Sequence, residues 1–296
     1  MKELRTVEAA YAKINLHLEV MAKRPDGYHE LDSVMQTVSL ADKVTIKVRH
    51  DQEGKMRLGC SISYIPTDER NIAWKVAKAF LAATDNEGDS LDIYIEKKIP
   101  VAAGLGGGSA DGAAVLRALN RLYGYPLTIE ALCELATSLG ADIPFCIVGG
   151  CRRTEGIGEI FTVVPGLSED VRLVIAMGKI GSNTARAYGK LDAKADRGCD
   201  KTALPMIEAL TEGNATKVAE RLFNRFEEVI LPDNADASAA RRIMKIAGAQ
   251  GTLMSGSGAA VFGMFDDEKK AQTATAMLRE KNFFAVTAKA INHIEK

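Results

Sequence analysis

The segment Lys97–Leu119 reads KKIPVAAGLGGGSADGAAVLRAL and places five glycines between an alternating apolar stretch and an Ala/Leu-rich stretch with helical spacing. Glycine adopts positive φ and lets a ligand approach the backbone. Free N–H groups at the start of a helix attract anions. A flexible linker would carry Ser and other polar residues on both sides, whereas here an expected strand and an expected helix flank the glycines. The segment therefore predicts a phosphate-binding loop.

The two best-known phosphate loops do not match. A Walker A loop needs a Lys after its last glycine, and a dinucleotide loop that starts at Gly104 would need glycine where Ser109 stands. Anion binding would then depend on backbone N–H groups and the helix N-terminus, with Ser109 able to reach a phosphate oxygen or Mg²⁺. This pattern favours ATP. We expect Ser109 to Asp111 to supply the helix N-cap and a first-turn acid.

Lys97 and Lys98 follow the strand that leads into the glycines. They could attract phosphate, but a solvated strand end is the commoner explanation.

The stretch AYAKINLHLEV, residues 10–20, alternates apolar and polar residues and predicts a half-buried strand. Lys13 and Asn15 lie on its polar face and can present two polar groups to one ligand, although a solvated strand lysine is the default alternative. A turn at residues 25–27, a second extended run and a third strand at Lys43–Arg49 complete an antiparallel unit. His29, directly after the turn, is by itself most simply an exposed histidine without a role.

Asp142 lies between a helix stop at Gly140 and the apolar Ile143-Pro144-Phe145. An N-cap or turn aspartate is as good an explanation as a catalytic carboxylate. As a base, Asp142 could take the proton of an acceptor hydroxyl, and an ammonium such as Lys13 within about 4–6 Å would favour its carboxylate form.

Elsewhere the pattern alternates between helices and strands. Helices are expected at residues 71–84 and 129–139, and a domain boundary near Pro165-Gly166. The second half is expected to begin with a strand at 171–177, followed by helices at 203–211, 216–230 and 236–247. Around residues 253–265 we expect a strand, a Ser/Gly turn and a second strand. A last amphipathic helix and a strand follow. This order predicts an α+β second domain.

Composition limits the function. The chain has 296 residues, 47% hydrophobic and 26% charged, with a net charge of −1 and a pI near 6.5. It is long enough for two domains and lacks general attraction for nucleic acid or anionic membranes, so its partners should be small molecules. Four scattered histidines offer no transition-metal motif, so we expect no protein-bound transition metal.

The location is expected to be cytoplasmic. No apolar run approaches the roughly 18 residues that span a bilayer, and MKELRTVEAA has charges where a signal peptide would be apolar. The five cysteines (Cys60, Cys133, Cys146, Cys151 and Cys199) form no C-x-x-C pair and suit a reducing compartment. Cys133 and Cys146 are expected to be small buried hydrophobes.

The segment P-x-x-x-G-L-G-G-G-S-A-D (Pro100–Asp111), with an S-G-S-G segment at Ser255–Gly258, resembles the GHMP small-molecule kinase superfamily. The resemblance implies ATP and Mg²⁺ as cofactors and a two-domain GHMP kinase fold of class α+β. Its ribosomal-S5-like N-terminal domain would occupy residues 1–165 and its ferredoxin-like C-terminal domain residues 166–296, with the site in the cleft between them.

Four blocks in the same order, AYAKINLHLEV, RPDGYHELDSVMQ, GADIPFC and MSGSGAAVFG, are similar to the branch of this superfamily that acts on a cytidine-diphosphate-linked methylerythritol. That branch phosphorylates the 2-hydroxyl of the polyol in non-mevalonate isoprenoid biosynthesis. Transferred by motif, the catalytic pair is Lys13 and Asp142. The ATP-binding residues would be Pro100, Gly104, Leu105, Gly106, Gly107, Gly108, Ser109 and Ala110. The substrate-binding residues would be Asn15, Tyr28, His29, Asp142, Thr184 and Tyr188.

Within that set, the resemblance assigns Tyr28 and His29 to the cytidine pocket, with His29 on the cytosine edge and Tyr188 stacked on the base. The resemblance therefore replaces the interpretation of His29 as an exposed histidine without a role. The chain departs from the family pattern at two places. Gly112 stands where the family usually has Ala, and Arg152-Arg153 stands where smaller residues are common. The two arginines could contact either the substrate phosphate or only solvent.

Two other functions compete. One is a GHMP kinase for mevalonate, homoserine or a sugar, against which the Gly-Tyr-His element argues. The other is a silent nucleotide-binding module, which the presence of both Lys13 and Asp142 disfavours. A monomer and a weak homodimer are equally compatible with the sequence.

Overall fold

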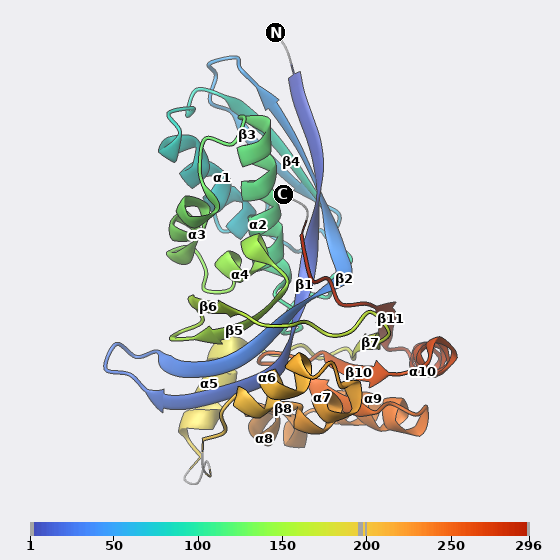
Figure 1. The fold of residues 1–296 in the computed structure, drawn as a ribbon. Coiled ribbons are helices and arrows are strands. Elements are labelled where there is room, and N and C mark those ends of the chain that lie inside the picture. Colours follow the sequence, from blue (N-terminus) through green and yellow to red (C-terminus); the bar gives the residue numbers. More distant parts are fainter. Residues whose placement is uncertain (1–2, 195–197, 199, 295–296) are drawn as a thin grey trace.

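The structure is a computed structural model that describes residues 3–194, 198 and 200–294 of the chain. Two long strands, β1 (Glu3–Lys23) and β2 (His29–Arg49), form an antiparallel hairpin that runs along most of the molecule (Figure 1). The second and third strands predicted in this region are therefore one continuous strand. The hairpin contributes residues to both ends of the candidate site described below.

The first sheet is built around this hairpin. Its other strands are β3 (Met56–Cys60), β4 (Ser90–Glu96), β5 (Cys151–Glu155), β6 (Ile160–Val163) and β8 (Phe223–Asn224). The order is β3-β4-β2-β1-β8. Strand β2 pairs with β4 over its second half and with β5 over residues 33–36, and β6 pairs only with β5 among the described strands.

Strand β1 is irregular where its polar residues cluster. Its register against β2 shifts between Tyr11 and Lys13 and again between Asn15 and His17. Such bulges redirect side chains and are common next to active sites. Lys13 and Asn15 are only 5% and 3% exposed, so the predicted half-buried strand is in fact buried on both faces. Loops from both halves of the chain cover its polar face.

Four helices lie on one face of the first sheet (Figure 1). They are α1 (Ile72–Ala83), α2 (Gly107–Leu122), α3 (Ile129–Thr137) and α4 (Ile143–Val148). Asn71 and Thr128 accept N–H groups of the first turns of α1 and α3, as N-caps do. A Cβ at Gly112 would lie 2.8 Å from Ile72 Cγ2, so this glycine allows α1 and α2 to pack closely.

The second sheet is four-stranded and antiparallel, in the order β11-β7-β10-β9. Its strands are β7 (Arg172–Met177), β9 (Gly251–Met254), β10 (Val261–Phe265) and β11 (Phe284–Ala288). The helices of this half are α5 (Thr184–Asp192), α6 (Leu204–Thr211), α7 (Ala215–Arg221), α8 (Glu227–Ile230), α9 (Ala235–Ile246) and α10 (Glu268–Glu280), with a 3₁₀ turn, η1 (Leu231–Asp233). Helices α9 and α10 pack on the sheet, which gives the predicted α+β arrangement.

The predicted helix at residues 216–230 is wrong. Strand β8 interrupts it, because Phe223 and Asn224 pair with His17 and Leu18 of β1. The Asn224 side chain donates to the carbonyls of Met254 (2.6 Å) and Gly256 (2.8 Å). A segment of the second half thus completes the first sheet. The domain boundary near residue 165 stays a prediction.

The cysteines Cys60, Cys133, Cys146 and Cys151 are free thiols, and Cys199 lies outside the described residues. Cys146 is buried, as expected, whereas Cys133 is half-buried. Within residues 3–194, 198 and 200–294, no helix has the length and apolar character needed to cross a membrane.

The glycine loop (residues 104–108) packs directly on the S-G-S-G loop (Ser255–Gly258). Ser255 Oγ donates to the Gly104 carbonyl (2.9 Å), and the Ala260 N–H donates to the Ala103 carbonyl (2.9 Å). A Cβ at Gly104 would lie 2.1 Å from the Ser255 carbonyl oxygen. This backbone contact joins the two halves of the molecule and requires glycine at position 104.

Gly104→Ala should therefore destabilise the protein more than Gly124→Ala. The two glycines have nearly the same φ, +76° and +77°, but a Cβ at Gly124 would meet nothing within 4 Å. Gly124→Ala should cost about 1–2 kcal/mol for the left-handed backbone alone. Gly104→Ala should lose about 1–3 kcal/mol more through overpacking. Urea denaturation of both variants measures the difference, and equal losses would contradict a tight contact between the loops.

Candidate active site

Lys13 and Asp142 meet in the structure. Lys13 projects from β1, Asp142 precedes α4, and Lys13 Nζ lies 3.5 Å from Asp142 Oδ2. The Lys13 side chain is 6% exposed, whereas that of Asp142 is 39% exposed. The carboxylate is thus the accessible member of the pair, and the ammonium is its buried support.

The Asp142 side chain is not used to cap its helix. Asp142 has the N-cap position of α4 and Pro144 lies in the first turn, but no hydrogen bond joins the carboxylate to the backbone of α4. The N-cap alternative is thus right for the backbone of Asp142 and wrong for its side chain, and the catalytic alternative stays a prediction. The backbone begins a helix, while the carboxylate remains available for chemistry beside Lys13.

The side chain of Asn15 joins Lys13 to the second half of the chain. Asn15 Oδ1 accepts hydrogen bonds from Lys13 Nζ (2.9 Å) and from the Gly256 backbone N–H (3.1 Å). Asn15 Nδ2 donates to Ser33 Oγ (2.9 Å), which in turn donates to the His17 carbonyl (2.6 Å). Gly256 belongs to the S-G-S-G motif, but its contact with Asn15 and the role of Ser33 had no local signal in the sequence.

Helix α2 begins inside the glycines rather than after them. Gly106 has φ +69° and is the residue that precedes the helix, so the predicted N-cap at Ser109–Asp111 is wrong. The first intrahelical bond runs from the Ala110 N–H to the Gly106 carbonyl (2.8 Å), which leaves the N–H groups of Gly107, Gly108 and Ser109 without a partner in the helix. Such groups form an anion site.

The same loop touches Lys13. The Lys13 N–H donates to the Leu105 carbonyl (3.0 Å), and a Cβ at Gly106 would lie 3.1 Å from Lys13 Cγ. Pro100, Gly104, Leu105 and Gly106 precede the helix, and Gly107, Gly108, Ser109 and Ala110 open it. Two of the residues predicted to bind ATP, Leu105 and Gly106, thus lie against Lys13.

Behind the loop lies a buried charge cluster of Asp42, Lys97 and Asp111. Lys97 Nζ binds the carboxylates of Asp42 and Asp111, the latter at 2.6 Å. Asp42 also accepts the Ile99 N–H (2.8 Å). The prediction of a solvated strand end is therefore wrong for Lys97, although Lys98 is exposed. The reason is non-local, because Asp42 comes from β2.

One ammonium in this cluster faces two carboxylates. Burial, opposed by Lys97 and assisted by the charge of Asp42, raises the pKa of Asp111 to about 7. Asp111 Oδ1 is buried and has no hydrogen-bond partner among the described residues. A proton on Asp111 makes the cluster electrically neutral, which is the favoured state of buried charges.

At the other end of the site, His29 and Tyr188 stack. Their ring centroids are 4.9 Å apart with an interplanar angle of 27°, and Tyr188 meets Phe226 edge-on at 4.9 Å. Burial, followed by the charge of Asp142, raises the pKa of Tyr188 to about 12. The phenol is therefore neutral near pH 7, and its environment includes the Asp142 carboxylate.

The remaining predicted residues differ in their surroundings. The Tyr28 side chain is 60% exposed in the β1–β2 turn and makes no ring contact with another described residue. Thr184 opens α5, and its Oγ1 lies 2.9 Å from Ser257 Oγ of the S-G-S-G loop. Arg153 binds Asp32 through Nε (2.9 Å), and Arg152 Nε donates to the Gly149 carbonyl (3.0 Å), so both have protein partners.

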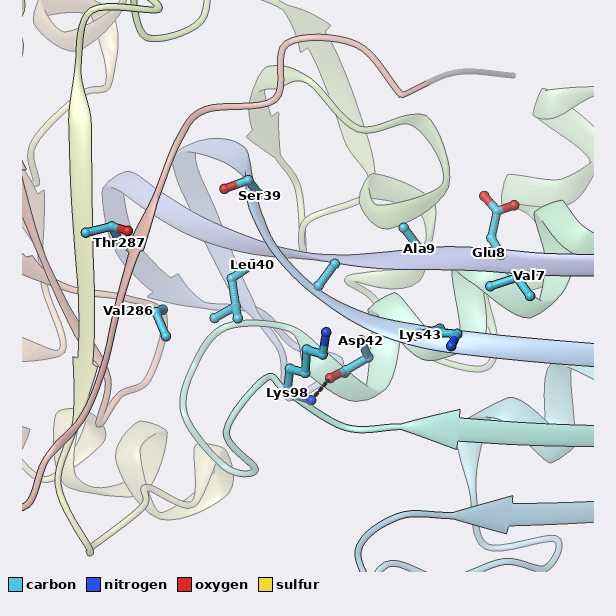
Figure 2. A pocket seen from close by; sticks show the side chains of 11 residues that line it. Val7, Glu8, Ala9, Ser39, Leu40, Asp42, Lys43, Lys98, Val286 and Thr287 are labelled. Carbon is cyan, nitrogen blue, oxygen red and sulfur yellow. Dashed lines mark hydrogen bonds between the residues drawn. The ribbon is translucent and has the colours of Figure 1, made fainter. Parts of the chain in front are cut away.

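A groove of about 470 Å³ lies between the first sheet and β11 (Figure 2). It is lined by residues 7–9 of β1, residues 39–43 around Asp42, Lys98, and residues 286–287 of β11. None of the residues predicted for the active site lines it. The candidate site is therefore identified by converging polar groups and not by this hollow.

Comparison with known proteins identifies the family of the chain. The family model for the GHMP kinases N terminal domain matches residues 71–150, and that for the GHMP kinases C terminal matches residues 206–283. The 4-diphosphocytidyl-2-C-methyl-D-erythritol kinase of Exiguobacterium sibiricum is 41% identical over 263 residues, 89% of this chain and 90% of the relative. That of Alkaliphilus metalliredigens is 41% identical over 266 residues, 89% of each chain.

Solved structures resemble the fold over nearly its full length. A crystal structure of 4-(cytidine 5'-diphospho)-2C-methyl-D-erythritol kinase matches with a TM-score of 0.79 and 31% identity over 96% of this chain and 99% of that one. A homoserine kinase from Cytophaga hutchinsonii matches with a TM-score of 0.78 but 16% identity, over 99% of this chain and 96% of that one. The α+β two-domain GHMP kinase fold is thereby confirmed.

Stability should depend on pH through Asp111. Its pKa is about 7 in the folded protein against 3.8 for a free carboxyl, so between these values the folded state binds a proton that the unfolded chain has released. The free energy of unfolding should therefore fall as the pH rises from 5 to 8. Asp111→Asn should make this slope shallower, whatever its effect on absolute stability. Urea denaturation at both pH values measures it.

Asp170→Asn, at an exposed carboxylate, is the matched control and should keep the wild-type slope. If the free energy of unfolding of Asp111→Asn depends on pH as steeply as that of the wild type, Asp111 is not the titrating group.

Proposed function

The chain belongs to the family of the 4-diphosphocytidyl-2-C-methyl-D-erythritol kinases, and we propose that it transfers the γ-phosphate of ATP to the 2-hydroxyl of that substrate, a step of non-mevalonate isoprenoid biosynthesis. The observation that carries the proposal is the contact between Lys13 and Asp142 beside the glycine loop, in a chain with this degree of identity to these kinases.

The chain's own residues account for the proton and the charge. Phosphoryl transfer requires positioning, charge neutralisation and an acceptor for the hydroxyl proton. The 2-hydroxyl oxygen would attack the γ-phosphorus, the bond to the β-phosphate oxygen would break and ADP would leave. Asp142, the exposed member of the pair, would take the proton, and Lys13 would stabilise the negative charge.

The start of α2 would hold the phosphates. The N–H groups of Gly107, Gly108 and Ser109 have no partner in the helix, and Ser109 Oγ makes no hydrogen bond within the described part of the chain. These groups fit Mg²⁺-ATP, since Mg²⁺ is usually held by one or two protein oxygens together with phosphates. Bound Mg²⁺ would neutralise phosphate charge.

The opposite end would hold the substrate. We place the cytosine at His29, Tyr28 and Tyr188, and the polyol near Asn15 and Thr184. Asn15 Oδ1 is already occupied by Lys13 and Gly256. Its contribution to the substrate would then be its second amide N–H, together with the orientation of Lys13.

Two general features belong to the same proposal. We place the domain boundary near residue 165, because the last strand before it, β6, pairs in the first sheet and the next, β7, pairs in the second. We place the protein in the cytoplasm, where free thiols persist and ATP is available.

One assay separates the candidate functions. ADP release is followed with Mg²⁺-ATP and, in parallel, the cytidyl substrate, mevalonate, homoserine and galactose. We expect turnover with the cytidyl substrate. ADP release with mevalonate alone would refute the proposed identity of the substrate. ATP binding without turnover of any compound would support a silent nucleotide-binding module.

Asp142→Asn should lower kcat by about 10²–10⁴-fold, the usual contribution of a general base. Affinity for ATP and the melting temperature should change little, because the carboxylate makes no capping bond. Steady-state kinetics, nucleotide titration and thermal melting test this. A variant with near-normal kcat would exclude Asp142 as the base.

His29→Ala should raise KM for the cytidyl substrate and leave KM for ATP nearly unchanged, because the ring belongs to the base-binding end. His50→Ala is the control, since His50 binds Asp89 at 2.8 Å and lines no part of the proposed site. Steady-state kinetics with each substrate varied in turn measures both constants. Equal effects of His29→Ala on both constants would argue against base recognition.

A further inference from the structure

Asp192, the last residue of α5, contacts the edge of the His29 ring. Asp192 Oδ1 lies 2.7 Å from His29 Nε2, and Asp192 Oδ2 accepts a hydrogen bond from Lys23 Nζ at 3.0 Å. Each carboxylate oxygen therefore has one partner. Asp192 belongs to none of the motifs that the sequence indicated.

Helix α5 holds the His29 ring from two sides. Tyr188 and Asp192 are four residues apart and so share one face of the helix. Tyr188 covers the face of the imidazole and Asp192 binds its edge, while the His29 side chain is only 4% exposed. The other ring nitrogen, Nδ1, makes no hydrogen bond to any described residue. It is the one polar atom of this ring left for a ligand.

The carboxylate determines which ring nitrogen carries the proton. Partial burial acts to raise the pKa of Asp192, but hydrogen bonds from Lys23 and His29 and the charge of Lys23 lower it, so the group is ionised near neutral pH. An ionised carboxylate only accepts hydrogen bonds, so Nε2 must donate. In a neutral imidazole the other nitrogen then presents a lone pair.

We propose that Asp192 is a positioning residue that sets the base specificity of the site. By holding His29 in the Nε2–H tautomer, it makes Nδ1 an acceptor. An acceptor fits the 4-amino group of cytosine, whereas it would face a lone pair on the 4-carbonyl oxygen of uracil. This inference rests on the proposed function, which places a cytosine base at His29.

Asp192→Asn provides a test because the substitution keeps the shape but supplies only one oxygen. The Lys23 ammonium has donors only and takes that oxygen. The amide NH₂ then faces His29 Nε2, which becomes the acceptor, and the proton moves to Nδ1. The variant should therefore favour the opposite tautomer.

The expected result is a fall of about ten- to hundredfold in the ratio of kcat/KM for the cytidyl substrate to that for its uridyl analogue, as for a mismatched buried hydrogen bond. KM for ATP should not change. Lys23→Met is the matched control. It removes the other partner of Asp192 but keeps the contact with His29, so the ratio should stay at the wild-type value. A merely structural role of Asp192 would lower both activities together.

Nitrogen-15 NMR of the histidine rings, assigned with His29→Ala, reports the tautomer independently of activity. We expect Nε2–H in the wild type and Nδ1–H in Asp192→Asn. Two results would overturn this inference but not the proposed function. One is a wild-type His29 that carries its proton on Nδ1. The other is a wild type that phosphorylates the cytidyl substrate and an Asp192→Asn variant with an unchanged ratio of cytidyl to uridyl kcat/KM. A wild-type protein that does not phosphorylate the cytidyl substrate would overturn the proposed function, and with it the specificity inference.

Discussion

The hydrogen bonds that Asn15 Oδ1 accepts from Lys13 and from Gly256 join the chemistry to the packing of the two halves. Lys13 belongs to β1, and Gly256 lies in the turn between β9 and β10 of the second sheet. One oxygen atom accepts hydrogen bonds from both groups, so the contact of the ammonium with Asn15 lies directly at the junction between the halves. The backbone contact of Gly104 with Ser255 lies in the same junction. The candidate site and the junction between the halves therefore share the same residues.

Such a junction buries polar side chains, which is costly unless each has a partner. The structure meets this requirement with residues from distant segments. Lys97 binds Asp42 and Asp111, and Glu19, which is fully buried on β1, binds Arg225 at 2.6 Å. Loss of Lys97, for example, would leave the buried carboxylates of Asp42 and Asp111 without a counter-charge, so these groups favour a single arrangement of the chain. That arrangement is the one that presents Lys13 and the start of α2 to the same ligand.

Sequence patterns were sufficient where the determining forces are local. The helices expected at residues 71–84 and 129–139 were predicted from neighbouring residues alone and form at Ile72–Ala83 and Ile129–Thr137. The helix across Phe223 and Asn224 was wrong because these residues pair with β1 and bind Met254 and Gly256, partners far away in the chain. Burial of Lys97 was missed for the same reason. The pairing of Lys13 with Asp142 followed from family resemblance and not from spacing, and Asp192 had no signal except its place one turn after Tyr188.

The shared fold does not select the substrate. A homoserine kinase resembles the chain in fold almost as closely as a kinase of its own family does, although its sequence is far less similar. The phosphate loop and a base with its cation serve any hydroxyl acceptor. Discrimination must then come from side chains that differ within the fold. In the proposed site these are His29 on β2 and Tyr188 and Asp192 on α5, which meet across the two halves as the two loops do. Because one packed junction fixes both ends, the distance from the nucleobase to the reacting hydroxyl becomes part of the recognition.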